Sequence, residues 1–310
     1  MNKLPQLSEI NRDEPKIKIY MFFSFDLVNS TAYKDEKKIE WLKVFAKFYD
    51  IIKKEMKQKF PSIRLWKYIG DEVLFYQALD SRFQLFETIP KAYEVLMSSL
   101  KHLTNLYPTI FKPLSIKGTV WCAKVIHAYG EELEDFKSEA PNIALDVAYE
   151  NNNSLRDFIG PDIDTGFRIS HYAGKEKVVI SANFASLLLL LETEVPEEVK
   201  KNLIQNLKIV SYEDLKGIWK NRYYPIIWYF KDLKKIEEDF DYDDRFRSKI
   251  INNICLGQIY DIKKLTKIFN QLGIQKDIDN LLELLKESES ILENKKILSQ
   301  DNELVPVKDP

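Results

Sequence analysis

Two aspartates stand where a protein can hold a metal ion beside a phosphate, and the first of them is Asp26. It lies in FSFDLVNST, at the end of an aromatic and β-branched run that predicts a strand, just before Ser30 and Thr31, which favour a helix start. Free N–H groups at a helix start attract anions such as phosphate. Carboxylate oxygens are the ligands that Mg²⁺ and Mn²⁺ prefer. The motif therefore predicts a place where metal and phosphate meet.

The second aspartate, Asp71, lies in WKYIGDEVLF. Strand-like runs at 63–69 and 72–79 flank Gly70-Asp71, which predicts a tight hairpin with Asp71 at its tip. Antiparallel packing of this hairpin beside the first strand would bring the two carboxylates together. Taken singly, Asp26 can be a helix cap and Asp71 an ordinary turn residue. Taken together, they predict a site for in-line phosphoryl transfer with two ions about 4 Å apart.

A third motif, DFIGPDIDTGFRIS, makes a family resemblance specific. Gly160, Ile163 and Arg168 fall on a helix pattern G-x-x-V-N-x-x-x-R. The chain resembles the class III nucleotidyl cyclases, in which a strand-end aspartate, an IGD-type hairpin aspartate and this helix occur in the same order. Asp164 stands where that family usually has asparagine, and a carboxylate cannot donate a hydrogen bond as an amide does. The resemblance covers about residues 17 to 230 and implies a ferredoxin-like α+β sandwich.

The resemblance also implies roles for individual residues. It implies that Asp26, Leu27 and Asp71 hold two Mg²⁺ or Mn²⁺ ions, and that Arg168 contacts the α-phosphate in the transition state. We expect Ser30 and Thr31 to bind the phosphates, and we place Asp164 with Arg168 in the catalytic set. The family further implies a homodimer with shared sites, in which the aspartates of one protomer face a set contributed by the other: Lys67, Asp157, Asp164 and Arg168.

The base of the substrate is predicted less directly. Lys67 and Asp157 match the positions that read adenine in adenylate cyclases, which leaves a cAMP-forming enzyme as an alternative. The stretches FSFDLVNSTAYK, Trp41 to Tyr49 and WKYIGDEVLF instead look most like the pyrimidine cyclases of bacterial Pycsar anti-phage systems. That subfamily resemblance implies that UTP or CTP is converted to cUMP or cCMP, an antiviral messenger read by a cyclic-nucleotide-sensing effector.

Bulky aromatic residues bear on the size of the base pocket. Phe48, Tyr49, Trp66 and Tyr68 would narrow such a pocket so that a one-ring base fits. An aromatic stripe at helical spacing also occurs in ordinary cores, so both interpretations stay open.

Other classes of function remain as alternatives. One alternative is a cyclase-homology domain that binds a nucleotide or a partner without turnover. Loss of a metal aspartate or of the arginine would favour this alternative, and neither residue type is lost. Gly70-Asp71-Glu72 resembles the turn of diguanylate cyclases, but the second glycine of that motif is missing. The helices expected after Lys231 can instead bind an effector.

Composition and charge exclude several classes of protein. The 46 basic and 48 acidic residues nearly balance, so no positive field favours nucleic acid. The N-terminus has no apolar leader and the longest apolar run is too short for a bilayer, so we expect a cytoplasmic protein without a membrane partner. Neither the cysteines nor the histidines show metal-ligand spacing: Cys122, Cys255, His102, His127 and His171.

The elements that must position these residues follow from periodicity. We expect strands at 17–27, 63–69, 72–79, 115–127, 177–182 and 223–230. We expect helices from about 29 to 60, at 81–106, from 160 to 174, and through 183–208 with a break at Pro196. A polar arm is expected at 129–153, and only helices after Lys231. The predicted division is a lead (1–16), a catalytic domain (17–230), a helical extension (231–297) and a tail (298–310).

Overall fold

A computed structural model describes residues 17–37, 39–109, 114–127, 142–148, 154–219, 222–231 and 260–303. The expected lead at 1–16, the helical positions from Ile250 to Ile259, Cys255 and the end of the tail lie outside these residues. The same holds for most of the expected polar arm.

The chain alternates strands and helices along one mixed sheet. The strands are β1 (Ile17–Val28), β2 (Arg64–Ile69), β3 (Glu72–Ala78), β4 (Ser115–Ile126), β5 (Asn142–Ala148), β6 (Ser154–Ile159), β7 (Val178–Ile180), β8 (Leu207–Asp214), β9 (Tyr223–Tyr229) and β10 (Tyr260–Asp261). The helices are α1 (Ser30–Lys37), α2 (Trp41–Lys59), α3 (Arg82–Leu106), α4 (Pro161–Ser170), α5 (Ala182–Leu190), α6 (Glu197–Asn202), α8 (Lys264–Leu272) and α9 (Gln275–Glu303), with short 3₁₀ turns η2 (Glu192–Glu194) and η3 (Ile204–Asn206).

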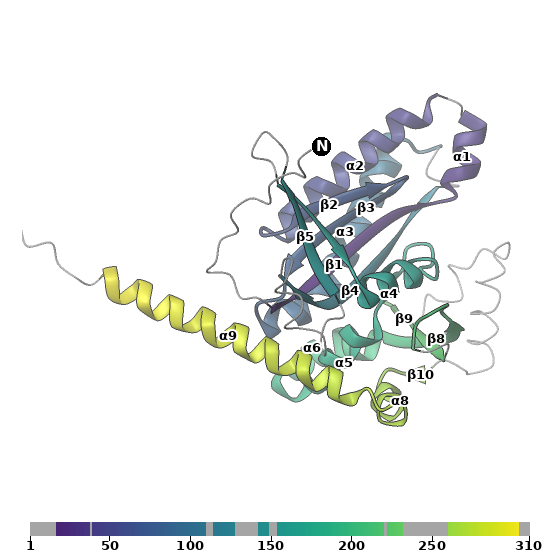
Figure 1. The fold of residues 1–310 in the computed structure, drawn as a ribbon. Coiled ribbons are helices and arrows are strands. Elements are labelled where there is room, and N and C mark those ends of the chain that lie inside the picture. Colours follow the sequence, from purple (N-terminus) through teal and green to yellow (C-terminus); the bar gives the residue numbers. More distant parts are fainter. Residues whose placement is uncertain are drawn as a thin grey trace, which may run out of the picture.

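The sheet has β1 and β4 near its centre and β2 at one edge. Its order is β10-β8-β9-β7-β4-β1-β3-β2, and β5 pairs with β4 and β6 (Figure 1). Side chains alternate along β1, so Phe23 and Phe25 enter the core against the helices, whereas Tyr20 and Phe22 enter a second cluster on the opposite face. The predicted α+β class is confirmed. The second face, covered by α4 and the β5–β6 hairpin, is the one that matters below.

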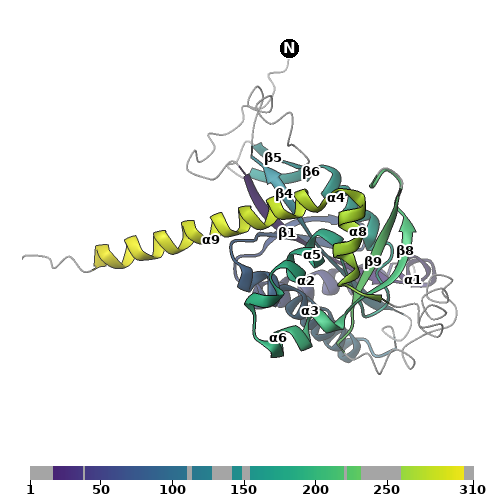
Figure 2. The same cartoon turned by 90° about the horizontal axis from the view of Figure 1, so that it is seen from below.

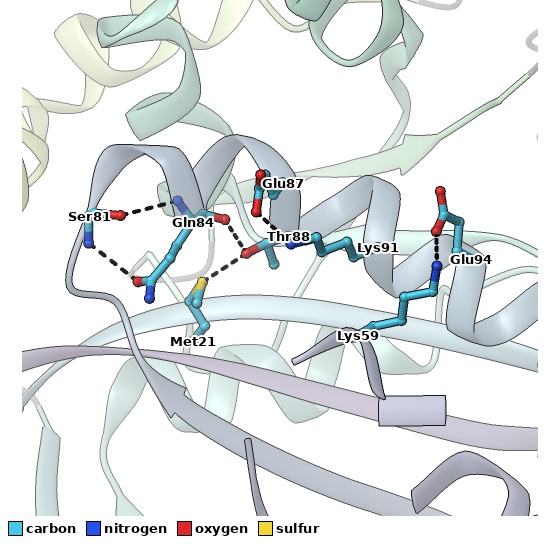
Figure 3. Close-up of polar contacts among 8 residues, drawn as sticks. All are labelled: Met21, Lys59, Ser81, Gln84, Glu87, Thr88, Lys91 and Glu94. Atoms are coloured by element: carbon cyan, nitrogen blue, oxygen red, sulfur yellow. Dashed lines mark hydrogen bonds and ion pairs between the residues drawn. The ribbon is translucent and has the colours of Figure 1, made fainter. Parts of the chain in front are cut away.

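Helix α3 is fixed at its start and along its length. Ser81 and Gln84 form a capping box, in which the Ser81 hydroxyl accepts from the Gln84 N–H and the Gln84 side chain accepts from the Ser81 N–H (Figure 3). Thr88 donates to the Met21 sulfur of β1 at 3.1 Å. These contacts hold α3 on the helical face of β1, away from the second cluster.

The C-terminal helices pack onto the same body. Helices α5, α8 and α9 lie together in Figures 1 and 2, and α9 then projects away from the sheet as a long rod. Ile278, Leu281 and Leu285 of α9 are buried. Arg82, at the start of α3, forms an ion pair with Glu289 at 2.8 Å. The extension therefore shares its core with the catalytic domain that we expected at 17–230.

Four sequence expectations differ from the structure. The helix expected from 29 to 60 is two helices, because the apolar stripe of α2 begins only at Trp41 while α1 docks separately through Tyr33. Part of the polar arm forms β5, stabilised by pairing with β6 and β4. The helix expected through residue 208 gives way to β8, which pairs with β9. Strand β10, paired with β8, lies where only helices were expected.

Two helix ends also differ. Helix α4 ends at Ser170, four residues before Gly174. Gly174 is nevertheless constrained, because a Cβ there would lie 2.6 Å from the Trp228 ring. Helix α9 continues to Glu303, past residue 298 where the tail was expected to begin.

Candidate active site

The first carboxylate, Asp26, is positioned by the register of the central strands. Phe25 pairs with Val73 of β3, and Asp26 pairs with Lys117 of β4. Asp26 lies four residues after Phe22 on the same strand, and alternate residues share a face. Its side chain therefore lies on the second face, with Phe22, and not against the helices. The Lys117 ammonium lies 3.1 Å from its Oδ2 atom. Asp26 thus enters the site with a lysine already beside it.

The second carboxylate, Asp71, is positioned by the β2–β3 turn. Gly70 has φ +62°, a left-handed conformation that glycine adopts without strain. Tyr49 of α2 donates a hydrogen bond to the Gly70 carbonyl, which ties the turn to α2. Antiparallel pairing of β3 with β1 brings Asp71 within hydrogen-bonding reach of Asp26. The two carboxylates predicted from separate motifs therefore meet at one end of the hairpin.

The two carboxyl groups differ in their electrostatics. Burial raises the pKa of Asp26 to about 6, and the negative charge of Asp71 adds to this, against the opposing effect of Lys117. Burial also acts on Asp71, but hydrogen bonds from Ser30 and Lys34 outweigh it and lower its pKa. Asp26 is therefore the carboxyl group of this pair that is more costly to ionise. A carboxylate that is costly to ionise in a partly buried site is stabilised by an added cation.

The second pair of predicted residues, Lys67 and Asp157, also meets. Lys67 of β2 lies 2.7 Å from Asp157 Oδ1, and the same oxygen accepts from the Trp66 indole at 2.8 Å and from the Phe158 N–H at 2.9 Å. The Lys67 ammonium lies 4.3 Å from the Trp66 ring centroid. Burial of Asp157 is outweighed by the Lys67 hydrogen bond and the two N–H donors, so its pKa is lowered. This pair fixes the β5–β6 hairpin over the edge of the sheet.

Helix α4 carries the predicted Asp164 and Arg168. Pro161 occupies its first turn, as expected for a helix start after Gly160. Gly166 faces β4 so closely that a Cβ there would lie 2.2 Å from the Trp121 ring. Asp164 is exposed in the first turn. Among the described residues, the Nε atom of Arg168 is buried without a hydrogen-bond partner, which leaves a guanidinium donor available.

The predicted site residues thus form two groups and a helix. Asp26 and Asp71 meet, with Ser30 beside Asp71, and Lys67 meets Asp157. Thr31 is exposed in the first turn of α1, and Leu27 is buried in the core against the helices. In the described part of the chain, no hydrogen bond or ion pair joins Arg168 or Asp164 to either carboxylate of the first group.

The aromatic residues considered for the base pocket take different positions. Phe48 is buried in the core between α2 and the sheet. Trp66 belongs to the second cluster, and the Tyr49 ring is tilted against that of the exposed Tyr68, with 4.8 Å between the ring centroids. The ring of Phe167 in α4 lies 5.8 Å from Trp66. Of the four expected aromatics, Trp66 lies directly beside the Lys67–Asp157 pair.

Three residues near the carboxylates were not predicted from sequence. Lys117 is a lysine in a strand, and only the β1–β4 register reveals its partner. Lys34 lies one helical turn after Ser30, a spacing that in hindsight marks one face of α1. Glu72 follows Asp71 directly, accepts a hydrogen bond from Ser24, and has its pKa raised by burial. His171, just after α4, is near enough to Glu72 to oppose this rise in pKa. The end of α4 therefore lies on the same side of the sheet as the carboxylates.

The first group fits a divalent metal by the chemistry of its donors. Asp26 and Asp71 supply hard oxygen ligands, and each has one lysine beside it, Lys117 at Asp26 and Lys34 at Asp71. No cluster of three or more histidine, cysteine, aspartate or glutamate side chains suited to a metal occurs among the described residues. Two carboxylates suffice for Mg²⁺, which keeps waters or substrate phosphates as its other ligands.

One cavity lies away from the carboxylates. It has a volume of about 590 Å³ and is lined by α2 and α3 residues that include Glu55, Lys59, Glu94 and His102. The Lys59–Glu94 ion pair at its edge is visible in Figure 3. Because Asp26 faces the opposite side of the sheet, we place the chemistry at the carboxylates and not in this groove. No helix in the described ranges has the length and apolar character needed to span a membrane.

Comparison with known proteins identifies the fold. No family model matches the sequence, and no curated protein matches it. The adenylyl cyclase CyaB from P. aeruginosa is similar in structure, with a TM-score of 0.50 and 14% identity over 70% of this chain and 95% of that chain. The guanylyl cyclase Cya2 has a TM-score of 0.48 and 12% identity over 69% of this chain and 91% of that chain. The predicted class III cyclase fold is confirmed.

Proposed function

We propose that the protein is a metal-dependent nucleotidyl cyclase that converts UTP or CTP to the 3′,5′-cyclic monophosphate and pyrophosphate. One observation carries the proposal: Asp26 and Asp71, from separate motifs, place their carboxyl groups within hydrogen-bonding reach of each other on the second face of the sheet of a cyclase fold. The pKa of Asp26, raised to about 6, supports the same interpretation because such a pair gains stability from an added cation.

The residues around the carboxylates define the proposed roles. Asp26, Asp71 and the backbone carbonyl of the neighbouring Leu27 would hold two Mg²⁺ or Mn²⁺ ions, which when bound lower the cost of forming the nucleophile and of releasing pyrophosphate. Ser30 and Thr31 open α1, whose free N–H groups favour phosphate. Lys117 adds a positive charge 3.1 Å from Asp26, suited to a phosphate oxygen.

Helix α4 supplies the groups that act on the ribose and the α-phosphate. Arg168 has a planar guanidinium with a buried, unpartnered Nε, and we assign it to the negative charge that develops on the α-phosphate. Asp164 is exposed, and when ionised it can accept hydrogen bonds but cannot donate them. We therefore propose that it accepts a hydrogen bond from a ribose hydroxyl. The contact between Gly166 and Trp121 fixes the helix that carries both.

We propose that two protomers share the sites across a two-fold axis. The β2 edge and the β5–β6 hairpin expose large apolar side chains, which favours a partner at this face: Leu65, Tyr68, Ile69, Leu145 and Ile159. A symmetric partner placed there would bring its Arg168 toward Asp26 and Asp71. The absence of a bond between Arg168 and the carboxylates within the described chain is consistent with this arrangement.

The preference for a one-ring base rests on the surroundings of Lys67 and Asp157. Trp66 and Phe167 crowd the pair, and Asp157 Oδ1 already accepts three hydrogen bonds. Such crowding favours a pyrimidine over the larger purine. Lys67 and Asp157 can form hydrogen bonds with the O2, O4 or N4 atoms of a pyrimidine. The specific observation that favours adenine is the Lys67–Asp157 pair itself, so an adenylate cyclase is the second candidate. We propose that the cyclic pyrimidine product signals to an antiviral effector.

Turnover with each base tests the proposal. Purified protein is incubated with Mn²⁺ and ATP, GTP, CTP or UTP, and products are separated by chromatography. We expect cUMP or cCMP with pyrophosphate. Equal or faster cyclisation of ATP would replace the pyrimidine assignment by adenylate cyclase. Nucleotide binding without any cyclic product would leave the non-catalytic alternative.

A further inference from the structure

Lys34 of α1 makes an ion pair that the proposed chemistry would have to break. Its Nζ atom lies 3.1 Å from Asp71 Oδ1. The ammonium also lies 4.9 Å from the Phe45 ring centroid and 5.7 Å from that of Trp41, both in α2. Aromatic faces attract a cation at these distances. The lysine head is therefore held at one place by an anion and two rings.

Asp71 meets two anion-binding groups of α1 at once. The Ser30 hydroxyl, one helical turn before Lys34, lies near enough to this carboxylate to help lower its pKa. The carboxylate thus occupies the anion position that these two side chains form. In the proposed function the same carboxylate binds metal, and a divalent ion beside it would repel the Lys34 ammonium.

We propose that Lys34 is a phosphate-binding residue, held on Asp71 until metal and triphosphate arrive and then transferred to the triphosphate. The inference rests on the proposed function and names a residue outside the family pattern. Lys34 suits the exchange, since its side chain is 30% exposed and its four-carbon stem is flexible. Trp41 and Phe45 keep the ammonium near the site during the exchange. If this exchange occurs, Lys34 should weaken the binding of the metal ion and strengthen the binding of the triphosphate.

The test compares Lys34→Met, Lys34→Arg and the control Lys37→Met in the full chain. Lys37 lies on the same helix and pairs only locally, with Glu36 at 2.5 Å. Titration calorimetry measures Mn²⁺ alone and then tripolyphosphate at saturating Mn²⁺. We expect Lys34→Met to bind Mn²⁺ about 2- to 5-fold more tightly, because Asp71 loses its competing cation, and tripolyphosphate about 10-fold more weakly. Lys34→Arg and Lys37→Met should stay near wild type.

Two further readouts separate this inference from its alternatives. Thermal unfolding checks that Lys34→Met is folded. The part of the tryptophan fluorescence that is lost in Trp41→Phe should change on addition of Mn²⁺ tripolyphosphate in wild type but less in Lys34→Met, as the ammonium shifts relative to the Trp41 ring. Unchanged tripolyphosphate affinity, or Mn²⁺ affinity that falls together with it, overturns the proposal. Neither binding measurement requires turnover, so opposite shifts without any cyclic product would refute the cyclase assignment and leave the Lys34 inference standing.

Discussion

Two acidic regions on the same face of the sheet differ in how their charge is satisfied. Around Asp157, one oxygen accepts from Lys67, the Trp66 indole and a backbone N–H, and the pKa of Asp157 is lowered. Around Asp26, burial and the charge of Asp71 raise the pKa to about 6 although Lys117 lies 3.1 Å away. In the first region, donors of the same chain stabilise the charge of the carboxylate. In the second region the carboxyl group of Asp26 stays costly to ionise despite the lysine beside it.

This difference indicates where an external cation belongs. A carboxylate with three internal donors gains little from a metal, whereas two adjacent carboxylates with two lysines gain much. The comparison therefore supports the proposal that Asp26 and Asp71 bind metal and that Lys67 and Asp157 serve in recognition or in anchoring the hairpin. The following experiments break or sharpen that assignment.

The largest effect is expected when a carboxylate of the first region is removed. We expect Asp26→Ala or Asp71→Ala to lower cyclisation by about a thousandfold or more, because each loses a metal ligand at a strand end and not a core contact. Asp157→Ala, the matched control, should lower it far less or change the base preference. Initial rates with Mn²⁺ and melting curves provide the measurements. A folded Asp71→Ala variant with normal turnover would exclude the two-metal assignment.

Mixed protomers test whether Asp26 and Arg168 of one site come from different chains. Asp26→Ala and Arg168→Ala should each be inactive alone. In a shared-site dimer, the mixed species keeps one intact site, so random exchange restores about a quarter of wild-type activity. The assay follows turnover after mixing, with heterodimers verified by differently tagged chains. No recovery despite heterodimers would mean that each site is built within one chain.

The pH dependence of metal binding should follow Asp26. Metal requires the ionised carboxylate, and the pKa of Asp26 is raised to about 6, so affinity should fall as the pH drops through that value. One bound proton predicts about a tenfold loss of Mn²⁺ affinity between pH 7 and pH 5. Calorimetry at both values measures it. Asp26→Asn should bind weakly at both, and a wild-type affinity independent of pH would contradict the assigned pKa.

The smallest effects concern stability of the metal-free protein, where the same substitution should act in opposite directions. The pKa of Asp26 is raised on folding, so its charge opposes folding above about pH 6, and Asp26→Asn should stabilise at pH 8 by on the order of 1 kcal/mol and little at pH 4. The pKa of Asp157 is lowered on folding, so its charge stabilises above its unfolded pKa and this is lost in acid.

Asp157→Asn should therefore destabilise at pH 8. Its side chain is 40% exposed, so screening limits the loss to a few tenths of a kcal/mol up to about 1. Urea unfolding at the two pH values measures both variants. The same sign for both substitutions at pH 8 would remove the distinction between the two regions.

Local sequence predicted those elements whose residues pack mainly through their own periodicity. The strand before Asp26, the Gly70-Asp71 hairpin and the helix at 81–106 correspond to β1, the β2–β3 turn and α3. The failures share a cause. The helix expected through 208 overlaps the start of β8, because Leu207 continues the helical spacing of Leu203 and Ile204. This segment is a strand because it pairs with β9. Strand β5 lies within the stretch at 129–153 that was expected to be a polar arm, and pairing with β4 and β6 makes it part of the sheet.

For the site, the sequence by itself determined that Asp26 ends a strand, that Asp71 occupies a turn and that Arg168 lies on a helix after Gly160. These follow from turn chemistry and helix-start preferences, which act over a few residues. Only the tertiary structure decided that Lys117 faces Asp26, that Lys34 holds Asp71 and that Lys67 meets Asp157. Partners such as Asp157, 90 residues from Lys67, are chosen by sheet register and hairpin packing, which no short-range pattern encodes.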